Sequence, residues 1–363
     1  MTYKILSLDG GGFRGVMSAR ILKAVEEKLD RPLHEYFDLV AGTSTGSILA
    51  AGIALGKTAD ELLNLYKRRG QEIFPDRIRS FRNLTRISRG FFPVNLYPHG
   101  VPGTKKKGLS TVLQEELGDT KIVEVEKPVL VIPAYNTLDR RTWWFVSNNP
   151  PSAPQWYDNI PIWELSSCSA SAPTFFPPYD LEVPQPQLEN QLIAGQKYSF
   201  IDGGVAANNP ALIAISHALF RPTEIAGELK DLSLRDISIL SIGTGKPTQP
   251  FSYQQVKSWG MMGWAVRLGD LFIPAPNGIT ESVCWQIIRE QDDENAKRVL
   301  RLDFDIDTRK EEDKVLETID DPHLYDRFIQ VTENYLQNAK ARVGKDKKIA
   351  PIDAISQFIA NNP

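Results

Sequence analysis

A serine framed by two glycines is the residue of this chain with the clearest chemical potential. Ser44 lies at the centre of a G-x-S-x-G pattern that begins at Gly42 and ends at Gly46. The pattern follows an apolar run at 37–41, typical of a buried strand, and precedes an apolar run at 47–55, typical of a buried helix. A sharp strand-to-helix turn of this kind lifts the serine hydroxyl out of the fold and indicates a nucleophile. The alternative is a turn that only connects two core elements.

A second glycine-rich turn, at 9–15, offers backbone N–H groups to an anion. Its sequence D-G-G-G-F-R-G follows a strand-like segment at 4–8 and opens a helical pattern at 16–29. The glycines also match the dinucleotide fingerprint G-x-G-x-x-G, which needs an acidic residue at the end of the second strand. Here Asp38 begins that strand instead. We therefore favour an oxyanion hole for acyl transfer over a dinucleotide-binding loop or a purely structural turn.

A third turn carries a carboxylate. Asp202 follows a short strand-like segment at 199–201 and is followed by Gly203 and Gly204. Because D-G-G is also a common hairpin turn, this motif by itself leaves a catalytic and a structural role open. In an open α/β sheet, a strand end of this kind lies on the edge where ligands bind.

The three turns, in this order and spacing, resemble the motifs of the patatin-like phospholipases, which comprise plant lipid acyl hydrolases and their bacterial relatives. Two further stretches are similar to that family, namely the small-residue and proline stretch at 169–178 and the strand and turn at 240–245. The likeness to the plant-type branch extends, more weakly, past residue 330. The resemblance therefore covers most of the chain, and three ordered motifs are far more specific than one.

The resemblance implies a Ser-Asp dyad that works without histidine, with Ser44 as nucleophile and Asp202 as general base. It also implies that Gly11 and Gly12 supply the N–H groups of an oxyanion hole, and that Arg14 assists the developing charge or a phosphate. Because an ordinary aspartate has a pKa of about 3.9, the dyad needs a desolvated carboxylate and relies on its oxyanion hole. The glycines that support these motifs are Gly10, Gly15, Gly42, Gly46, Gly203 and Gly204.

The function implied by the resemblance is a lipid acyl hydrolase of phospholipase A type, a non-specific carboxylic ester hydrolase that forms an acyl-enzyme. Its substrates would be acyl esters of phospholipids or galactolipids in membranes or micelles. One alternative is a phospholipase effector switched on by a nucleotide ligand, as in some bacterial relatives. Others are a Ser-Asp-His hydrolase, a non-catalytic dinucleotide-binding protein, and a storage or interaction protein without catalysis.

The histidines bear on the choice between a dyad and a triad. The order Ser, Asp, His of the α/β-hydrolases fits His217 or His323 formally. His217, however, falls inside a helical pattern at 211–220, and His323 follows Asp321 and Pro322 at the first turn of a late helix. We therefore expect neither histidine to act as the base.

The cysteines and the remaining glycine-rich turn give no sign of a cofactor. Cys168 and Cys284 are far apart in sequence, and free buried thiols are the default for such residues. No histidine pair has the spacing of metal ligands. The segment 243–247 lacks the first glycine and the final Ser or Thr of a P-loop. We expect no metal site, no cofactor, and no requirement for calcium, zinc or ATP.

Strand-like and helical segments alternate along the chain. This alternation predicts an α/β fold with three layers, α/β/α, around a central and mainly parallel sheet. We expect a catalytic core at 1–245 and a mostly helical C-terminal extension at 246–363, packed on the same unit. The predicted strands are 4–8, 38–41, 128–134, 141–146, 199–201 and 237–242, with 298–306 as a further candidate.

Two helical predictions concern particular boundaries. Asn208 or Asn209 as N-cap, with Pro210 at the first helical position, predicts the start of a helix over 211–220. The segment 310–343 is predicted to be helical, because its apolar residues recur on one face.

Composition is that of a soluble enzyme with a large core. The 363 residues carry a net charge of −3 and are 42% hydrophobic and 24% charged. No apolar run reaches the roughly 18 residues that a membrane-spanning helix needs. The N-terminus enters a strand after three residues, so we expect no signal peptide and a cytoplasmic protein.

Two segments suggest peripheral contact with membranes. Between 67 and 107 there are eleven basic and two acidic residues, and each basic residue near anionic headgroups contributes about 1 kcal/mol; intramolecular ion pairs are the alternative. The segment 258–273 holds two tryptophans, two methionines and two charges, and is either buried core or a mobile flap that meets lipid. No recognition motif accompanies the basic charge, so we expect no nucleic-acid partner.

Overall fold

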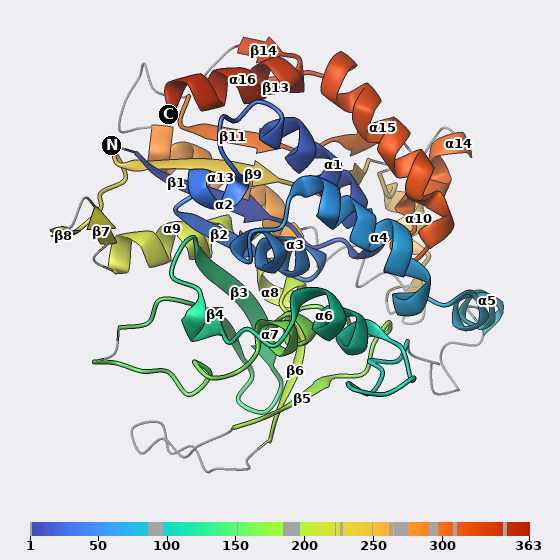
Figure 1. The fold of residues 1–363 in the computed structure, drawn as a ribbon. Helices are drawn as coiled ribbons and strands as arrows, with labels where there is room; N and C mark the ends of the chain where they lie inside the picture. The colour runs from blue at the N-terminus through green and yellow to red at the C-terminus, as the bar shows by residue number, and fades with distance from the viewer. Residues whose placement is uncertain are drawn as a thin grey trace.

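One eight-stranded sheet runs through the described part of the molecule (Figure 1). The computed structural model describes residues 2–85, 97–150, 152–183, 197–221, 223–225, 228–248, 250–260, 264, 275–289, 297–307, 311–343 and 347–363. The strand order is β11-β9-β1-β2-β3-β6-β5, with β4 paired to β3. These strands are β1 (Tyr3–Leu8), β2 (Leu39–Gly42), β3 (Val129–Asn136), β4 (Arg141–Val146), β5 (Tyr179–Glu182), β6 (Lys197–Asp202), β9 (Ile237–Ile242) and β11 (Val299–Leu302).

The sheet has a parallel half and an antiparallel half. β1 pairs in parallel with β2 and β9, β9 with β11, and β2 with β3. β3 pairs antiparallel with β4 and β6, and β6 with β5. Leu8 at the end of β1 is in register with Gly42 at the end of β2. The turns that follow these two strands therefore meet at the same edge of the sheet.

Helices cover both faces of the sheet (Figure 1). On one face lie α1 (Gly15–Glu26), α3 (Thr45–Ala54), α4 (Ala59–Ile73), α6 (Leu109–Leu117), α7 (Ile162–Ser169), α15 (Tyr325–Asn338) and α16 (Pro351–Asn361). On the other face lie α9 (Ala211–Phe220) and α13 (Ala275–Arg289). The other helices of the described ranges are α2 (Leu33–Tyr36), α5 (Asp76–Thr85), α8 (Gly204–Ala207), α10 (Tyr253–Lys257) and α14 (Glu311–Lys314).

Three small two-stranded sheets complete the described strands. They pair β7 (Thr223–Ile225) with β8 (Glu228–Lys230), β10 (Lys246–Pro247) with β12 (Asp305–Ile306), and β13 (Ala341–Val343) with β14 (Lys347–Ile349).

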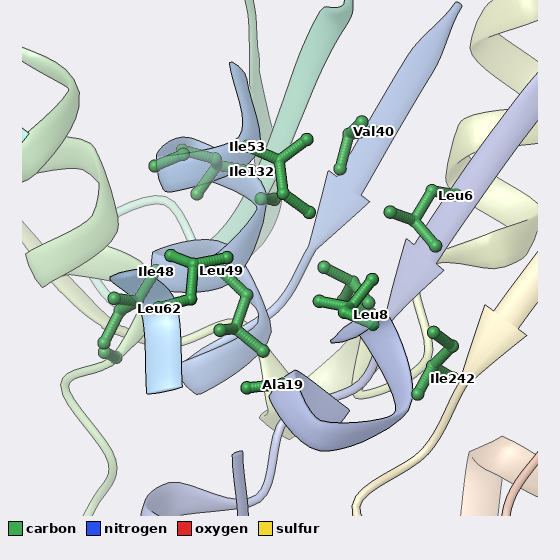
Figure 2. Close-up of a cluster of buried hydrophobic side chains, with 14 of the residues drawn as sticks. Leu6, Leu8, Ala19, Val40, Ile48, Leu49, Ile53, Leu62, Ile132 and Ile242 are labelled. Carbon is green, nitrogen blue, oxygen red and sulfur yellow. The ribbon is translucent and has the colours of Figure 1, made fainter. Parts of the chain in front are cut away.

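Alternate residues of the parallel strands fill the two interfaces between the layers. Leu6 and Val40 pack with Ile48 and other residues of α1, α3 and α4 (Figure 2). Ile5 and Leu39, the neighbours that point to the opposite face, belong to a second cluster with residues of α9 and α13. Apolar burial on both faces is characteristic of parallel strands between helical layers. The predicted three-layer α/β/α fold is confirmed.

α9 has the predicted bounds, but its N-cap lies later than predicted. Pro210 is the N-cap residue of this helix rather than its first helical residue. The side chain of Asn209 still caps the helix, because its Oδ1 accepts the N–H of Ala211 at 3.0 Å.

The helical prediction for 310–343 is wrong at its C-terminal end. α15 ends at Asn338, and the chain then forms β13, which pairs antiparallel with β14. Ala341 and Val343 are buried whereas Arg342 is exposed. This period-two alternation buries one face of a strand and would not give a helix an apolar face.

The two cysteines are free and buried, as predicted. Burial raises the pKa of both thiols, that of Cys284 to about 12. Among the described residues, no helix is both long enough and apolar enough to cross a bilayer.

Candidate active site

Ser44 occupies a sharp bend between β2 and α3. It lies directly before the first residue of α3, and its backbone dihedrals, φ 55° and ψ −124°, fall in a sparsely populated region. Gly42 and Gly46 make this bend possible. A Cβ on Gly42 would lie 2.0 Å from the carbonyl oxygen of Gly46, and one on Gly46 would lie 2.2 Å from that of Leu8. Only glycine fits where β1, β2 and α3 approach so closely.

The hydroxyl of Ser44 donates a hydrogen bond to Asp202 Oδ2 over 2.5 Å. Asp202 is the last residue of β6, and its other carboxylate oxygen accepts the N–H of Gly204 at 2.7 Å. The fold thereby joins two residues that are 158 positions apart in sequence. Only 8% of Ser44 and 6% of Asp202 is exposed, so the pair is shielded from bulk water.

Burial raises the pKa of Asp202 to about 6, while the hydrogen bonds from Ser44 and Gly204 act to lower it. Desolvation disfavours the carboxylate, so the group is a stronger base than an exposed aspartate. A Ser-Asp dyad needs a desolvated carboxylate at this position, and the environment of Asp202 has this property.

The glycine-rich turn after β1 lies beside Ser44. A Cβ on Gly10 would come within 3.1 Å of the Ser44 Cβ. Gly12 has φ +58°, a left-handed conformation that favours glycine, and begins the one-turn 3-10 helix η1 (Gly12–Arg14). Among the hydrogen bonds between described residues, none uses the N–H of Gly11 or Gly12. These two N–H groups thus have no acceptor among the described residues.

Hydrogen bonds from distant parts of the chain hold this glycine turn in place. The N–H of Gly10 donates to Asn208 O at 3.1 Å, and its carbonyl accepts from Thr244 Oγ1 at 2.9 Å. The N–H of Phe13 donates to Ile319 O at 2.7 Å. Asn208 was predicted only as a helix cap, and the contacts of Thr244 and Ile319 with the glycine turn were not predicted. No local pattern marks Ile319, because its contribution is a main-chain carbonyl.

The side chain of Ser169 binds the main chain of the nucleophile. Its hydroxyl accepts the N–H of Ser44 at 2.9 Å and donates to the carbonyl of Pro133 at 2.6 Å. Ser169 is the last residue of α7 and fully buried. It is the first residue of the small-residue stretch at 169–178, but its type and position alone did not indicate this contact.

The remaining predicted site residues lie around this centre. Arg14 ends η1, is half-buried, and donates its main-chain N–H to Gly11 O at 3.3 Å. Gly15 begins α1, where a Cβ would lie 2.3 Å from Tyr66 Oη. Gly203 follows Asp202, and a Cβ there would lie 2.2 Å from a carbonyl oxygen of β3. These glycines allow close packing around Ser44 and Asp202.

The described contacts of the four histidines are with residues other than Ser44 and Asp202. His323 bonds to Asp76 at 3.0 Å and to Gln71 at 3.1 Å. His99 shares a 2.8 Å hydrogen bond with the carbonyl of Pro177. His217 lies within α9, and burial lowers its pKa to about 4. His34 lies 3.9 Å from its neighbour Glu35. Among the described interactions of Ser44 and Asp202, none involves a histidine.

No group of three or more metal-ligating side chains occurs within the described ranges. The carboxylate nearest the glycine turn in sequence, Asp9, is instead paired with Arg301 at 2.5 and 2.8 Å. The site chemistry available to these residues is thus that of a hydroxyl, a buried carboxylate and backbone N–H groups.

Comparison with known proteins agrees with this geometry. The family model described as patatin-like phospholipase matches residues 6–215. The chain belongs to this family. Membership confirms the resemblance noted from the motifs of this patatin-like chain.

Plant proteins are among its relatives. Patatin-like protein 2 of Arabidopsis thaliana is 30% identical over 283 residues, which cover 72% of this chain and 64% of that protein. Patatin-like protein 2 of Oryza sativa subsp. indica is 29% identical over 286 residues, covering 72% of this chain and 66% of the rice protein. The chain thus spans about two thirds of the length of these relatives. Patatin-1-Kuras 2 of Solanum tuberosum is 26% identical over 379 residues, with 98% and 91% covered.

Solved structures give weaker likenesses. VipD from Legionella pneumophila is 11% identical with a TM-score of 0.36, covering 92% of this chain and 67% of that one. Human GIVD cytosolic phospholipase A2, in complex with methyl gamma-linolenyl fluorophosphonate, is 11% identical with a TM-score of 0.40, covering 99% and 59%. Likenesses this weak have no bearing on the function of this patatin-like chain.

The basic segment 67–107 is partly neutralised within the molecule. Arg69 forms ion pairs with three glutamates, Arg79 with Asp76 and Asp321, and Lys107 with Glu115. Intramolecular pairing, the alternative stated for this segment, therefore accounts for these three cations. Residues 86–96 lie outside the described ranges.

Most of the tryptophan-rich segment 258–273 also lies outside the described residues. Of the part that is described, Trp259 stacks edge to face on Trp264, with ring centroids 5.0 Å apart. Trp264 is 41% exposed. For this residue the buried-core alternative is wrong.

Proposed function

We propose that this chain is a lipid acyl hydrolase of phospholipase A type in which Ser44 attacks the acyl carbonyl and Asp202 transfers the proton. The observation that carries the proposal is the 2.5 Å hydrogen bond from the Ser44 hydroxyl to a buried carboxylate. A nucleophile needs a base within hydrogen-bond reach, and Asp202 meets this requirement. The family assignment supports the lipid ester as the substrate class.

In the first step, Ser44 Oγ bonds to the carbonyl carbon and its proton passes to Asp202 Oδ2. The carbonyl oxygen becomes an oxyanion, which the free N–H groups of Gly11 and Gly12 stabilise. The N-terminus of α3 begins at the nucleophile and adds its partial positive charge. One oxyanion donor contributes about 3–4 kcal/mol in other hydrolases. Arg14 assists this charge or a phosphate of the substrate from the end of η1.

The next steps return the enzyme to its starting state. When the tetrahedral intermediate collapses, the ester C–O bond breaks and the leaving alcohol takes the proton from Asp202. For a phospholipid this alcohol is a lysophospholipid. Water then gives a proton to Asp202 and attacks the acyl-Ser44 ester. Collapse of the second intermediate releases the fatty acid and returns the proton to Ser44 Oγ.

Exposed aromatic side chains support contact with a lipid surface. Phe251 packs edge to face on Trp259, which packs in the same way on Trp264, and both centroid distances are 5.0 Å. Phe251 is 42% exposed and Trp264 41%. Aromatic rings of this kind favour membrane–water interfaces. We therefore propose peripheral membrane contact through 258–273, with 67–107 as a second region.

The dinucleotide-binding alternative has no support from the position of Asp38. This residue precedes β2, whereas the glycine turn follows β1 at the other end of the sheet. Its carboxylate accepts the N–H of Lys4 at 2.8 Å and lies 3.2 Å from Lys127. It is therefore remote from the position where a ribose would bind.

Hydrolysis of a short p-nitrophenyl ester tests the proposal. The Ser44→Ala variant should lose this activity, while Ser356→Ala, a serine on the exposed side of α16, should keep it. Fluorophosphonate labelling followed by mass spectrometry should place the label on Ser44, and EDTA should leave activity unchanged. Labelling at a different serine, or activity that depends on a metal, would contradict the assignment.

A further inference from the structure

A cavity with a strongly basic wall lies beside β11 and the β13–β14 hairpin. Its volume is about 460 Å³, within the range of small-molecule sites. Among the described residues, its charged lining has two acidic members, Glu281 and Asp303, against five basic ones. The basic members are Lys246, Arg301, Lys340, Arg342 and Lys348. Two of the five, Lys246 and Arg301, form ion pairs with Asp305 and Asp9. The cations of the wall without an ion pair among the described residues are Lys340, Arg342 and Lys348.

The two strands of the hairpin bring cations close together. Arg342 and Lys348 are direct cross-strand partners. Like charges in that position are destabilising unless an anion lies between or beside them. Within the described part of the chain, neither these two residues nor Lys340 forms an ion pair, and Arg342 lies over the ring of Trp285 at 4.6 Å. An anion in the cavity would relieve this repulsion.

A buried guanidinium provides an independent indication. The side chain of Arg301 is only 7% exposed. Its two terminal nitrogens donate to Asp9, to Ser241 Oγ at 2.7 Å and to Asp303 at 2.9 Å. Its Nε is buried and has no acceptor among the described residues. Buried donors in folded proteins are nearly always satisfied, so Arg301 keeps one donor for an acceptor outside the described residues.

We propose that this cavity binds a small molecule that carries a phosphate group. A carboxylate brings one negative charge, whereas a phosphate brings up to two and offers three acceptor oxygens. Guanidinium groups match the geometry of such oxygens, and lysines add charge without restricting orientation. The phosphate belongs either to a soluble compound or to a lipid headgroup, and the experiment below separates these two sources.

One residue of the cavity, Arg301, contacts the residue that precedes the glycine turn. Arg301 holds Asp9, and Asp9 is the residue that precedes Gly10. A phosphate that accepts a hydrogen bond from the same guanidinium would change the Arg301–Asp9 contact. It would thereby change the position of the glycine turn beside Ser44. This second part of the proposal rests on the proposed function, because it requires the turn to act as an oxyanion hole.

Thermal unfolding of the full chain with inorganic pyrophosphate tests binding. The Tm should rise by several degrees, since a ligand that binds only the folded state stabilises it. Lys340→Gln plus Lys348→Gln should abolish the rise. Lys28→Gln plus Lys121→Gln removes the same charge from exposed positions outside the cavity and should keep the rise. An equal rise in Tm in both double variants would overturn the proposal.

Vesicles test the lipid source of the phosphate. If a lipid headgroup is the ligand, phosphatidylcholine vesicles that contain phosphatidic acid should bind the Lys28/Lys121 control but not the Lys340/Lys348 variant. In that case pyrophosphate should not shift the Tm. A pyrophosphate shift without selective vesicle binding assigns the site to a soluble phosphate compound. If neither probe distinguishes the two variants, the cavity is not a phosphate site.

The link to Ser44 is measured by the rate of fluorophosphonate labelling. Pyrophosphate should change this rate at least about twofold in the parent chain and leave it unchanged in the Lys340/Lys348 variant; an equal rate with and without pyrophosphate overturns the link. The Tm shift should persist in Ser44→Ala. Binding is thus tested even if the proposed hydrolase function fails.

Discussion

The hydroxyl of Ser169 connects the main-chain N–H of Ser44 to the carbonyl of Pro133, with distances of 2.9 and 2.6 Å. The bend at the nucleophile is therefore tied to the central strand β3 as well as to its own helix. This contact matters because Ser44 is held in a sparsely populated backbone conformation that its surroundings must maintain.

Ser169→Ala should leave the N–H of Ser44 buried without an acceptor. A lost partner of this kind costs about 1–3 kcal/mol, so we expect a lower Tm and a turnover reduced at least tenfold. Ser167→Ala is the matched control. Ser167 is also buried in α7, but its hydroxyl only bonds the carbonyl of Trp163 in the same helix. If both variants behave alike, Ser169 acts only in packing.

Asp202→Asn should lower turnover by at least about 100-fold, because general-base assistance is worth roughly 10²–10⁴. His217→Ala and His323→Ala should stay within a few-fold of the parent chain. Rates on a short soluble ester, measured for all three variants, decide the matter. A histidine variant as inactive as Asp202→Asn would replace the dyad with a triad.

The same substitution should stabilise the fold at neutral pH. The folded-state pKa of Asp202 is raised to about 6, so the folded protein binds a proton more tightly than the unfolded chain does. Ionisation therefore removes stability as the pH rises from about 4 to about 6, by up to about 3 kcal/mol above that range. Denaturant unfolding should show Asp202→Asn more stable at pH 7, with the difference vanishing near pH 4.

Activity should depend on one group with a pKa of about 6. Asp202 must be ionised to accept the proton of Ser44, so kcat/KM for a soluble ester should fall tenfold per pH unit below that value. A pH–rate profile between 4.5 and 8 checks this, after control incubations show that the chain stays folded. A midpoint near 4 would mean that Asp202 is solvated in the active enzyme.

Gly12→Ala should inactivate the enzyme by displacing the glycine turn. The new Cβ would lie 2.3 Å from Ile319 O, and Gly12 has φ +58°. Gly118→Ala is a matched control, since Gly118 has φ +70° but nothing within 4 Å of an added Cβ. Both variants place an L residue at positive φ, which costs about 1–3 kcal/mol. Only Gly12→Ala should also lose ester hydrolysis, and similar activities would argue against a catalytic turn.

The tryptophans of the 258–273 segment should matter for lipid in vesicles. Trp259→Ala plus Trp264→Ala should reduce vesicle hydrolysis far more than hydrolysis of a soluble ester, with Tm nearly unchanged. Trp144→Ala removes a tryptophan of β4 that is 47% exposed and serves as control. Equal losses on both substrates would exclude an interfacial role.

The parts of this structure that sequence predicts are those with a local signature. β4, β9 and α9 begin and end at the predicted residues, because apolar runs bounded by polar turns define them. Ser44, Asp202 and the glycine turn were found because each lies in a short motif. α6, α7 and β5 were not predicted.

The contacts that complete the site have no such signature. Thr244 and Ile319 reach the glycine turn through a single hydroxyl and a single carbonyl, and many residue types could supply the latter. The Arg301–Asp9 pair joins positions 292 residues apart, which no spacing rule anticipates. Tertiary packing decides these contacts, so one sequence does not reveal them.

Through the carbonyl of Ile319, the last third of the chain helps to hold the glycine turn at 9–15 in place. The family match ends at residue 215, yet Phe13 donates its N–H to Ile319, more than 300 positions later. β9 likewise has β11 along its outer side. A protein shortened after residue 245 would bare the hydrogen-bonding groups of β9 as an open edge, where another chain can add a strand. Its DGGGFRG loop would also lose one of its anchors, so aggregation and inactivity would arise from the same cut.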